Sequence, residues 1–354
     1  MTTSDAARAA TRTAADAPAR TAAGTAARTD SLGTAPRRPE AWAATCRVRR
    51  LTVADLPDCL DLAADRGWSR EEGRWRLLLS AGQGFGVDAP PGDAAGGLIA
   101  SVVATRYPGL DGGPGLSCLG MMLVAQRYAR RGLGLRLMRH VIAAERDGGA
   151  AAMFLTATEQ GRPLYERLGF VPLGSLGTLR GHLAAGAAPT TPPGAATIRP
   201  ATAADLPAVL AYDRSAFGAD RTALLTRLPS FADQFLVAES AAPADSTEST
   251  GSAAARRLTG FAAAWPNVAS TVIGPVVADD PDTALALVSR LATGAPAGTP
   301  VRFDADARQP EPAGWLRAHG LVPYGSPVTV MVDGLPALPG DAGRRFAPYS
   351  LALG

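Results

Sequence analysis

An internal repeat is the feature that most constrains how this chain can fold. Val48–Pro57 matches Ile198–Pro207 almost position by position, about 150 residues further on. A second pair of segments, Glu166–Pro172 and Arg317–Pro323, falls at nearly the same offset. Such a period is too long for a solenoid. The sequence therefore predicts two similar domains in one chain.

Each copy of the repeat begins in the same way. A short apolar segment is followed by a threonine, Thr52 or Thr202, and then by an aspartate, Asp55 or Asp205. A threonine hydroxyl accepts hydrogen bonds from the free amides of a helix start, and an aspartate in the first turn complements the positive end of the helix dipole. The pattern predicts a strand that leads into a capped helix at the start of each domain.

Composition divides the chain further. Ala, Thr, Pro and Gly dominate residues 1–44, which predicts a disordered tail. The two predicted domains are residues 45–183 and 196–335, joined by a Pro-, Gly- and Ala-rich linker at 184–195 and followed by a tail of uncertain structure at 336–354. Ser240–Arg257 interrupts the second domain as a mobile loop. Segments of strand and helix type are mixed in order, so we expect an α/β fold.

Composition also argues against several classes of protein. No apolar run approaches the roughly 18 residues of a membrane span, and the N-terminal stretch has no apolar signal-peptide core. The formal net charge of +3 is too small to indicate nucleic-acid binding. The three cysteines and three histidines are scattered, so we expect no metal site and a cytoplasmic location. The chain has no lysine, which indicates the codon usage of a GC-rich bacterium.

The strongest chemical signal lies between a predicted strand, Leu116–Val124, and a predicted helix that begins near Gly132. The first turn of a helix has unpaired amides and a partial positive charge, so it attracts an anion. Gly132 and Gly134 leave room for a phosphate beside the backbone, and Arg130 and Arg131 add guanidinium groups. Neither a dinucleotide-binding fingerprint nor a P-loop is complete here. The segment by itself therefore predicts an anion site for a phosphate, and an ordinary helix start with a solvated arginine cluster is its other interpretation.

Three segments together resemble the GNAT acetyltransferase superfamily. They are Met121–Val124 before the loop, the Gly132-x-Gly134 pair in it, and Leu164–Phe170 after the next predicted strand. The resemblance covers most of Cys46–Leu183, and the whole chain is similar to a tandem bacterial GNAT protein. It implies two GNAT-like domains, the second divergent, each a mostly antiparallel sheet flanked by helices, with acetyl-CoA as the co-substrate.

The same resemblance implies roles for individual residues. The backbone of Met122, Leu123 and Val124 would pair with the pantetheine arm of coenzyme A as an added strand does. Tyr165 would protonate the departing thiolate while a primary amine of a small molecule or peptide attacks the thioester directly. Thr158 stands where relatives often carry an asparagine that contacts pantetheine. The pyrophosphate would lie in a cradle of backbone amides contributed by Arg130, Arg131, Gly132, Leu133, Gly134 and Leu135.

Alternatives stay open for these residues. Tyr165 has a second interpretation, as an aromatic side chain that only packs on the sheet. The whole chain has an alternative function, as a non-catalytic sensor of acyl-CoA. No carboxylate lies on the strand Leu116–Val124 to act as a general base; Glu159 is the nearest by sequence, and a solvated loop is its other interpretation. Cys118 on that strand has no evident histidine partner, so we expect it in the core.

The second copy lacks the features that indicate a cofactor. The equivalent segment, Ile273–Asp282, keeps a strand and a helix start but has aspartates at 279, 280 and 282 in place of the glycines and arginines. Leu316 stands at the position of the tyrosine. Because carboxylates would repel an anionic cofactor, we expect this copy to retain the fold without binding coenzyme A. Its role stays open between closing the substrate pocket, holding a homodimer and stabilising the first copy.

Overall fold

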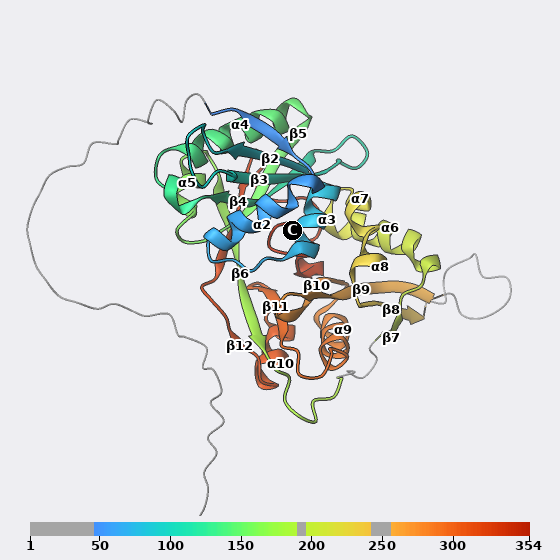
Figure 1. The fold of residues 1–354 in the computed structure, drawn as a ribbon. Helices are drawn as coiled ribbons and strands as arrows, with labels where there is room; N and C mark the ends of the chain where they lie inside the picture. The colour runs from blue at the N-terminus through green and yellow to red at the C-terminus, as the bar shows by residue number, and fades with distance from the viewer. Residues whose placement is uncertain (1–45, 190–195, 242–255) are drawn as a thin grey trace, which may run out of the picture. The chain divides into compact units, whose positions relative to one another are not determined.

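The computed structural model describes residues 46–189, 196–241 and 256–354. The predictions for residues 1–44, for the end of the linker and for most of Ser240–Arg257 fall outside these ranges. Within the unit Pro39–Gly354, the predicted repeat is visible as two copies with the same order of strands and helices (Figure 1).

Copy one begins with a strand and two helices and continues with strands that enclose the longest helix of that copy. Its elements are β1 (Val48–Leu51), α2 (Leu56–Asp65), α3 (Glu72–Ala81), β2 (Gln83–Asp88), β3 (Leu98–Tyr107), β4 (Gly115–Val124), α4 (Leu133–Asp147), β5 (Ala150–Ala157), α5 (Arg162–Glu166) and β6 (Val171–Gly181). The strand predicted at Leu116–Val124 is thus β4, and the helix predicted from Gly132 is α4.

Copy two repeats this order with more divided early helices. Its elements are β7 (Thr197–Pro200), α6 (Leu206–Phe217), α7 (Thr222–Leu225), α8 (Leu228–Phe231), β8 (Gln234–Ala241), β9 (Arg256–Asn267), β10 (Ser270–Ala278), α9 (Pro281–Thr293), β11 (Val301–Asp306), α10 (Pro310–Ala318), β12 (Val322–Pro323) and β13 (Val328–Asp333), followed by β14 (Arg345–Ala347). None of the helices in the described ranges is long and apolar enough to cross a membrane.

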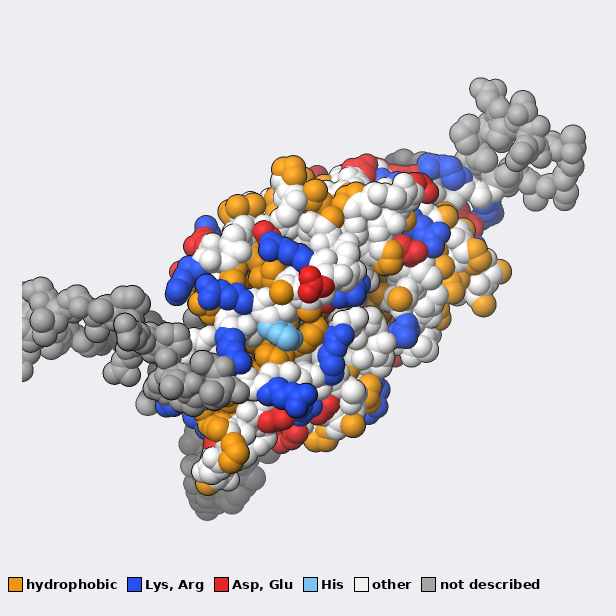
Figure 2. Space-filling model, turned by 90° about the horizontal axis from the view of Figure 1, so that it is seen from above, with side chains coloured by type: hydrophobic (Ala, Val, Ile, Leu, Met, Phe, Trp, Pro, Cys, Tyr) orange, Lys and Arg blue, Asp and Glu red, His pale blue; other side chains and the backbone are white. Residues whose placement is uncertain are grey.

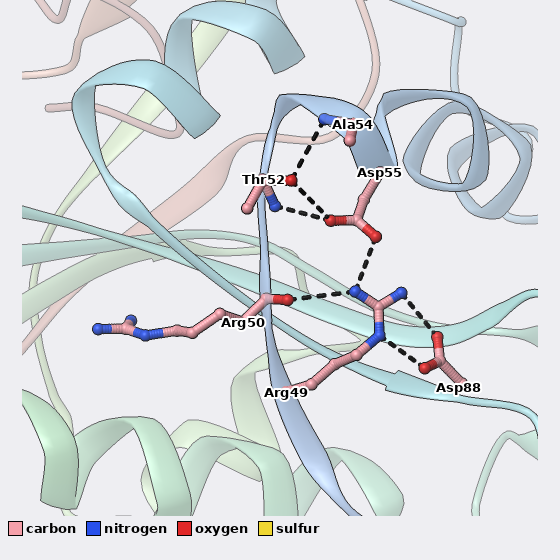
Figure 3. A network of polar contacts seen from close by, with 6 residues as sticks. All are labelled: Arg49, Arg50, Thr52, Ala54, Asp55 and Asp88. Carbon is pink, nitrogen blue, oxygen red and sulfur yellow. Dashed lines mark hydrogen bonds and ion pairs between the residues drawn. The ribbon is translucent and has the colours of Figure 1, made fainter.

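The repeated sequence motif holds the start of each copy together. In copy one, Arg49 on β1 donates from Nη1 to Asp55 Oδ1 at 2.7 Å and from Nε to Asp88 Oδ2 on β2 at 2.6 Å (Figure 3). The amide of Thr52 donates to Asp55 Oδ2 at 2.7 Å, which completes the expected helix cap. The arginine therefore ties the first strand both to its neighbour and to the helix start.

Copy two contains the same network. Arg199 on β7 pairs with Asp205 at 2.6 Å and with Glu239 on β8 at 2.5 Å. The amide of Thr202 donates to Asp205 at 2.7 Å. Because both copies use these residues in the same structural contacts, the conspicuous repeat is a folding signature and does not mark a site.

The two copies share one sheet and exchange a strand within it. The order along the sheet is β1-β2-β3-β4-β5-β13-β6-β11-β10-β9-β8-β7. Strand β13 of copy two lies between β5 and β6 of copy one, and β6 pairs on its other side with β11 of copy two. Only the pairs β4–β5 and β10–β11 on this path are parallel. The α/β fold with a mostly antiparallel sheet is confirmed, and the two copies build that sheet together.

Residues 336–354, expected as a tail of uncertain structure, return to the core. Strand β14 pairs antiparallel with β10 of copy two. The side chains of Phe346, Tyr349 and Leu353 are buried. Tyr107 on β3 of copy one donates from its hydroxyl to the carbonyl of Leu353 at 2.5 Å. The segment therefore passes from the sheet of copy two to the central strands of copy one.

Candidate active site

A slot opens between β4 and β5 of copy one. The two parallel strands pair from Gly115↔Ala150 as far as Leu119↔Leu155, and both continue beyond that point without pairing to each other. The cause is a bulge in β4 at Met121, whose φ of 53° lies in the left-handed region. The buried hydroxyl of Ser101 donates to the carbonyl of Met121 at 3.0 Å and holds the bulge in place.

The backbone beyond the bulge presents one edge to the slot. Leu123 and Val124 pair with Ser101 and Ala100 of β3 on one side only. On the other side, β4 has no strand partner at these positions among the described residues. An edge of this kind accepts an extended molecule by main-chain hydrogen bonds. The predicted residues Met122, Leu123 and Val124 therefore line a slot of the required form.

The start of α4 supplies an anion site at the mouth of the slot. Gly132 has a φ of 84° and precedes a helix that has no side-chain cap. The amide of Arg136 donates to the carbonyl of Gly132 at 3.1 Å, while the amides of Leu133, Gly134 and Leu135 donate to no acceptor within the described part of the chain. Three free donors and the helix dipole converge here.

Gly134 brings the helix start and the slot together. A β-carbon at this position would lie 3.0 Å from Cε of Met122, 3.5 Å from Cγ2 of Val124 and 3.6 Å from Cδ2 of Leu164 on α5. Met122 and Val124 are half-buried and face this point. A glycine here lets the helix start and the slot approach each other closely. Residues predicted from three separate segments thus meet at one place.

The arginines of the loop differ in what they contact. Arg130 and Arg131 are exposed near the helix start, with the Arg131 guanidinium 5.5 Å from the centre of the Tyr128 ring. Arg127 instead pairs with Asp93, Nε to Oδ2 at 3.0 Å. On the face drawn in Figure 2, arginine side chains surround apolar surface and are interspersed with acidic ones.

Asp93 anchors this loop, and sequence reasoning missed it. Its Oδ2 accepts hydrogen bonds from the Tyr128 hydroxyl at 2.7 Å and from Arg127. The hydrogen bonds from Tyr128 and Arg127 lower the pKa of the Asp93 carboxyl to about 2. No spacing rule connects it to the loop, because it lies in a turn-rich segment between β2 and β3.

Tyr165 lies on α5, the helix whose Leu164 packs beside Gly134. Its side chain is 8% exposed and contacts Phe170 edge to face, with ring centres 6.1 Å apart. Burial raises its pKa to about 12. Its hydroxyl has no hydrogen-bond partner in the described ranges. The ring therefore packs on its neighbours, as the packing interpretation expects. Its hydroxyl remains available to a ligand, as the catalytic interpretation requires.

Thr158 lies in the turn before α5. Its Oγ1 accepts a hydrogen bond from the amide of Gly161 at 3.1 Å, and its carbonyl accepts one from Arg162 at 2.9 Å. The residue thus holds the turn that leads into α5. Its side chain is exposed, and the hydroxyl proton is still free to be donated. Contact with pantetheine stays a prediction.

The chain resembles acetyltransferases in both halves. Models of the acetyltransferase (GNAT) domain match residues 92–172 and, separately, residues 209–347. The chain belongs to the GNAT acetyltransferase family. It carries two GNAT domains in tandem, as the repeat and the motifs predicted, and it is an acyltransferase.

Individual relatives agree with this assignment. The uncharacterized N-acetyltransferase YitH of Bacillus subtilis is 29% identical over 246 residues, which cover 69% of this chain and 77% of that protein. A solved putative acetyltransferase from Pyrococcus horikoshii has a TM-score of 0.65 at 19% identity, covering 87% of this chain and 96% of its own. A tandem GNAT protein from the clavulanic acid biosynthesis pathway has a TM-score of 0.51 at 14% identity, covering 82% and 99%. These two structures show a shared fold.

The equivalent slot of the second GNAT copy is filled by the chain itself. Strand β10 pairs with β11 only as far as Ile273↔Phe303. Beyond that point Val276 and Val277 pair with β9 on one side and with β14 on the other. Strand β14 thus takes the position along β10 that is vacant along β4. Sequence reasoning did not foresee this filling.

The helix start of the second GNAT copy is also occupied. Asp280 caps α9, accepting a hydrogen bond from the amide of Thr283 at 2.8 Å. Asp279 pairs with Arg257 at 2.8 Å and with Arg344 at 3.0 Å. A carboxylate therefore takes one amide of this helix start, and Pro281 has no amide to offer. This gives a physical basis to the prediction that copy two binds no coenzyme A.

Two further residues of copy one were considered as catalytic groups, Cys118 as a nucleophile and Glu159 as a general base. Cys118 is buried, its Sγ lies 3.6 Å from the carbonyl of Ala352, and burial raises its pKa, so it is unsuited to act as a thiolate. Glu159 is exposed on the loop before α5. In the described ranges, no group of His, Cys, Asp and Glu is arranged to hold a metal ion.

Proposed function

We propose that the first GNAT copy transfers an acetyl group from acetyl-CoA to a primary amine of a small molecule or peptide. The observation that carries this proposal is the combination of an open β4 edge with three free amides at the start of α4. A pantetheine arm fits an edge that offers main-chain hydrogen bonds, and a pyrophosphate fits the helix start. The family supplies acyl transfer, and this geometry supports copy one as the place for it.

The chemistry follows from where the thioester would lie. The amine nitrogen forms a bond to the acetyl carbon, the carbon–sulfur bond breaks, the sulfur takes a proton and the nitrogen loses one to water. Tyr165 would donate the proton to sulfur. A pKa of about 12 keeps this hydroxyl protonated at neutral pH but makes it a weaker acid than a free phenol. A hydrogen bond from Tyr165 would therefore stabilise the departing sulfur before the proton is fully transferred.

Titration of the purified chain with acetyl-CoA tests the proposal directly. We expect one saturable site per chain by calorimetry, and release of free thiol when a panel of amines is added. Absence of acetyl-CoA binding would contradict the proposal. Binding without turnover on any amine would favour the second candidate, a sensor of acyl-CoA.

Tyr165→Phe should retain acetyl-CoA binding and lower kcat by about 100-fold, the usual contribution of a positioned general acid. The substitution keeps the ring that packs on Phe170, so the melting temperature should hardly change. Because the pKa of Tyr165 is raised to about 12, the wild-type rate should show no loss from tyrosine ionisation below about pH 11. An unchanged kcat would leave Tyr165 with a packing role only.

A further inference from the structure

A cavity lies between the two GNAT copies, on the face of the sheet opposite the helix start. In the β3–β4–β5 register, Cys118 is opposite Phe154, and both point away from the face on which Gly134 meets Met122 and Val124. The cavity, of about 80 Å³, is lined there by Cys118, Phe154 and Thr156. Thr156 directly follows the last β4–β5 pair, so the cavity adjoins the closed end of the slot.

The opposite wall of the cavity comes from copy two and is charged. It includes Arg221 at the start of α7, Arg308 after β11 and Arg345 on β14. A second cavity, of about 150 Å³, shares Arg308 and Arg345 with the first. The cofactor slot belongs to copy one alone, whereas the cavity behind it is completed by copy two.

The three arginines are not equally neutralised. Arg221 pairs with Asp213 at 2.6 Å, and both side chains are almost fully buried. Arg308 pairs with Asp306 at 2.5 Å. Arg345 is half-buried and pairs with no carboxylate in the described ranges.

Asp306, which lines both cavities and is already paired with Arg308, and Asp341 compensate the charge of Arg345 only in part. Its Nε is buried without a partner, and its guanidinium lies 5.7 Å from the centre of the Phe217 ring. Burial, followed by repulsion from Arg221 and Arg308, lowers its pKa to about 10. A guanidinium in this setting gains from an anion that enters the cavity.

The rest of the lining is largely apolar. Besides Phe154 and Phe217 it includes side chains from β6, from β13 and from the segment after it, namely Leu176, Val330 and Leu338. A ligand that suits the cavity therefore has an apolar body and one anionic end. Its other end would face Thr156 at the closed end of the slot.

We propose that this cavity binds the acceptor, and that the acceptor is a small amine carrying a carboxylate, which Arg345 holds while the amine faces the slot. The inference rests on the proposed acetyl transfer in copy one and deepens it. A carboxylate fits a cavity of this size, and the planar guanidinium binds it through two parallel hydrogen bonds. On this view the second GNAT copy supplies the acceptor specificity of the first.

Matched acceptors test the proposal on the full-length protein. Straight-chain ω-amino acids from glycine to 6-aminohexanoate are compared with their uncharged amides as acceptors with acetyl-CoA. We expect kcat/KM to be at least about tenfold higher for the best acid than for its amide. Arg345→Met should lower kcat/KM for that acid by about 10- to 100-fold, leave the amide unaffected and leave the KM for acetyl-CoA unchanged.

Two controls separate the possible failures. Arg317→Met, on the exposed surface of α10, should change none of these values. Because Arg345→Met removes a poorly solvated charge, it should not lower the melting temperature. Without any enzyme assay, the best acid should raise the melting temperature of the wild type and not that of Arg345→Met.

The outcomes separate a failure of the proposed acceptor site from a failure of the proposed acetyl transfer. If the protein binds acetyl-CoA but acetylates the acid and its amide equally well, and Arg345→Met changes neither rate, the inference about Arg345 is wrong. The proposed acetyltransferase activity would be unaffected by that result. Absence of acetyl-CoA binding would overturn the function, while the acid-dependent thermal shift would still decide whether Arg345 holds a carboxylate. A thermal shift that is the same in both variants would refute that role.

Discussion

Gly134→Glu should weaken acetyl-CoA binding by about 100-fold or more, which corresponds to roughly 3 kcal/mol. The new carboxylate would lie beside the free amides of Leu133, Gly134 and Leu135 and take the place of the pyrophosphate. The second GNAT copy also has a carboxylate at this helix start, where Asp280, the residue before α9, accepts from the amide of Thr283. Calorimetric titration with acetyl-CoA measures the effect.

The fold should survive this substitution. A β-carbon at Gly134 comes within 3.0 Å only of the flexible end of Met122, and a carboxylate in the first turn stabilises a helix. Gly134→Ala should therefore weaken binding only slightly. Gly314→Glu is the matched control, because this exposed helical glycine of copy two has nothing within 4 Å of its β-carbon position. A dissociation constant unchanged by Gly134→Glu would place the pyrophosphate elsewhere.

The part of this site that was predictable from sequence is the part encoded locally. A strand, a Gly-x-Gly turn and an amphipathic helix follow one another along the chain between Leu116 and Asp147, so their periodicity and their glycines could be interpreted directly. Tyr165 could be placed on a following helix for the same reason. The bulge at Met121 could not, because it depends on a hydrogen bond from Ser101 on another strand.

Strand β2 shows why local patterns also fail inside one copy. Gly84 and Gly86 lower the strand propensity of Gln83–Asp88, and no strand was expected there. A β-carbon at Gly84 would come within 2.7 Å of Cβ of Leu51, and one at Gly86 within 2.7 Å of Cδ2 of the same leucine. The glycines are needed for close packing of β1 on β2, a requirement that exists only in the assembled sheet.

The exchange of strands between the two copies could not be predicted from the sequence. Strands β6 and β13 occupy equivalent places in the repeat, and nothing in either segment states which copy it will join. The choice is made by distant surfaces, as is the pairing of β14 with β10. Pairing partners far apart in sequence are a property of the whole fold, so a repeat in sequence does not show that each copy folds alone.

This exchange makes a strong prediction about the separated halves of the chain. Residues 46–189 and 196–354, expressed apart, should each fail to give a cooperative unfolding transition. The first fragment would lack β13 between β5 and β6, and the second would lack β6 beside β11. Met331 and Val332 of β13 are buried in a core that also contains Phe154 of β5, so separation exposes apolar surface on both fragments.

Co-expression of the two fragments provides the control. Together they contain every strand of the shared sheet, so they should associate into a complex that unfolds cooperatively and binds acetyl-CoA as the intact chain does. Urea titration followed by circular dichroism, with size-exclusion chromatography of each sample, measures this. If residues 196–354 folded alone, β6 would be dispensable to copy two. The second copy would then be a separate domain attached to the first. The observed pairing instead makes the second copy part of the structure that holds β5 in place, and β5 forms the closed end of the slot.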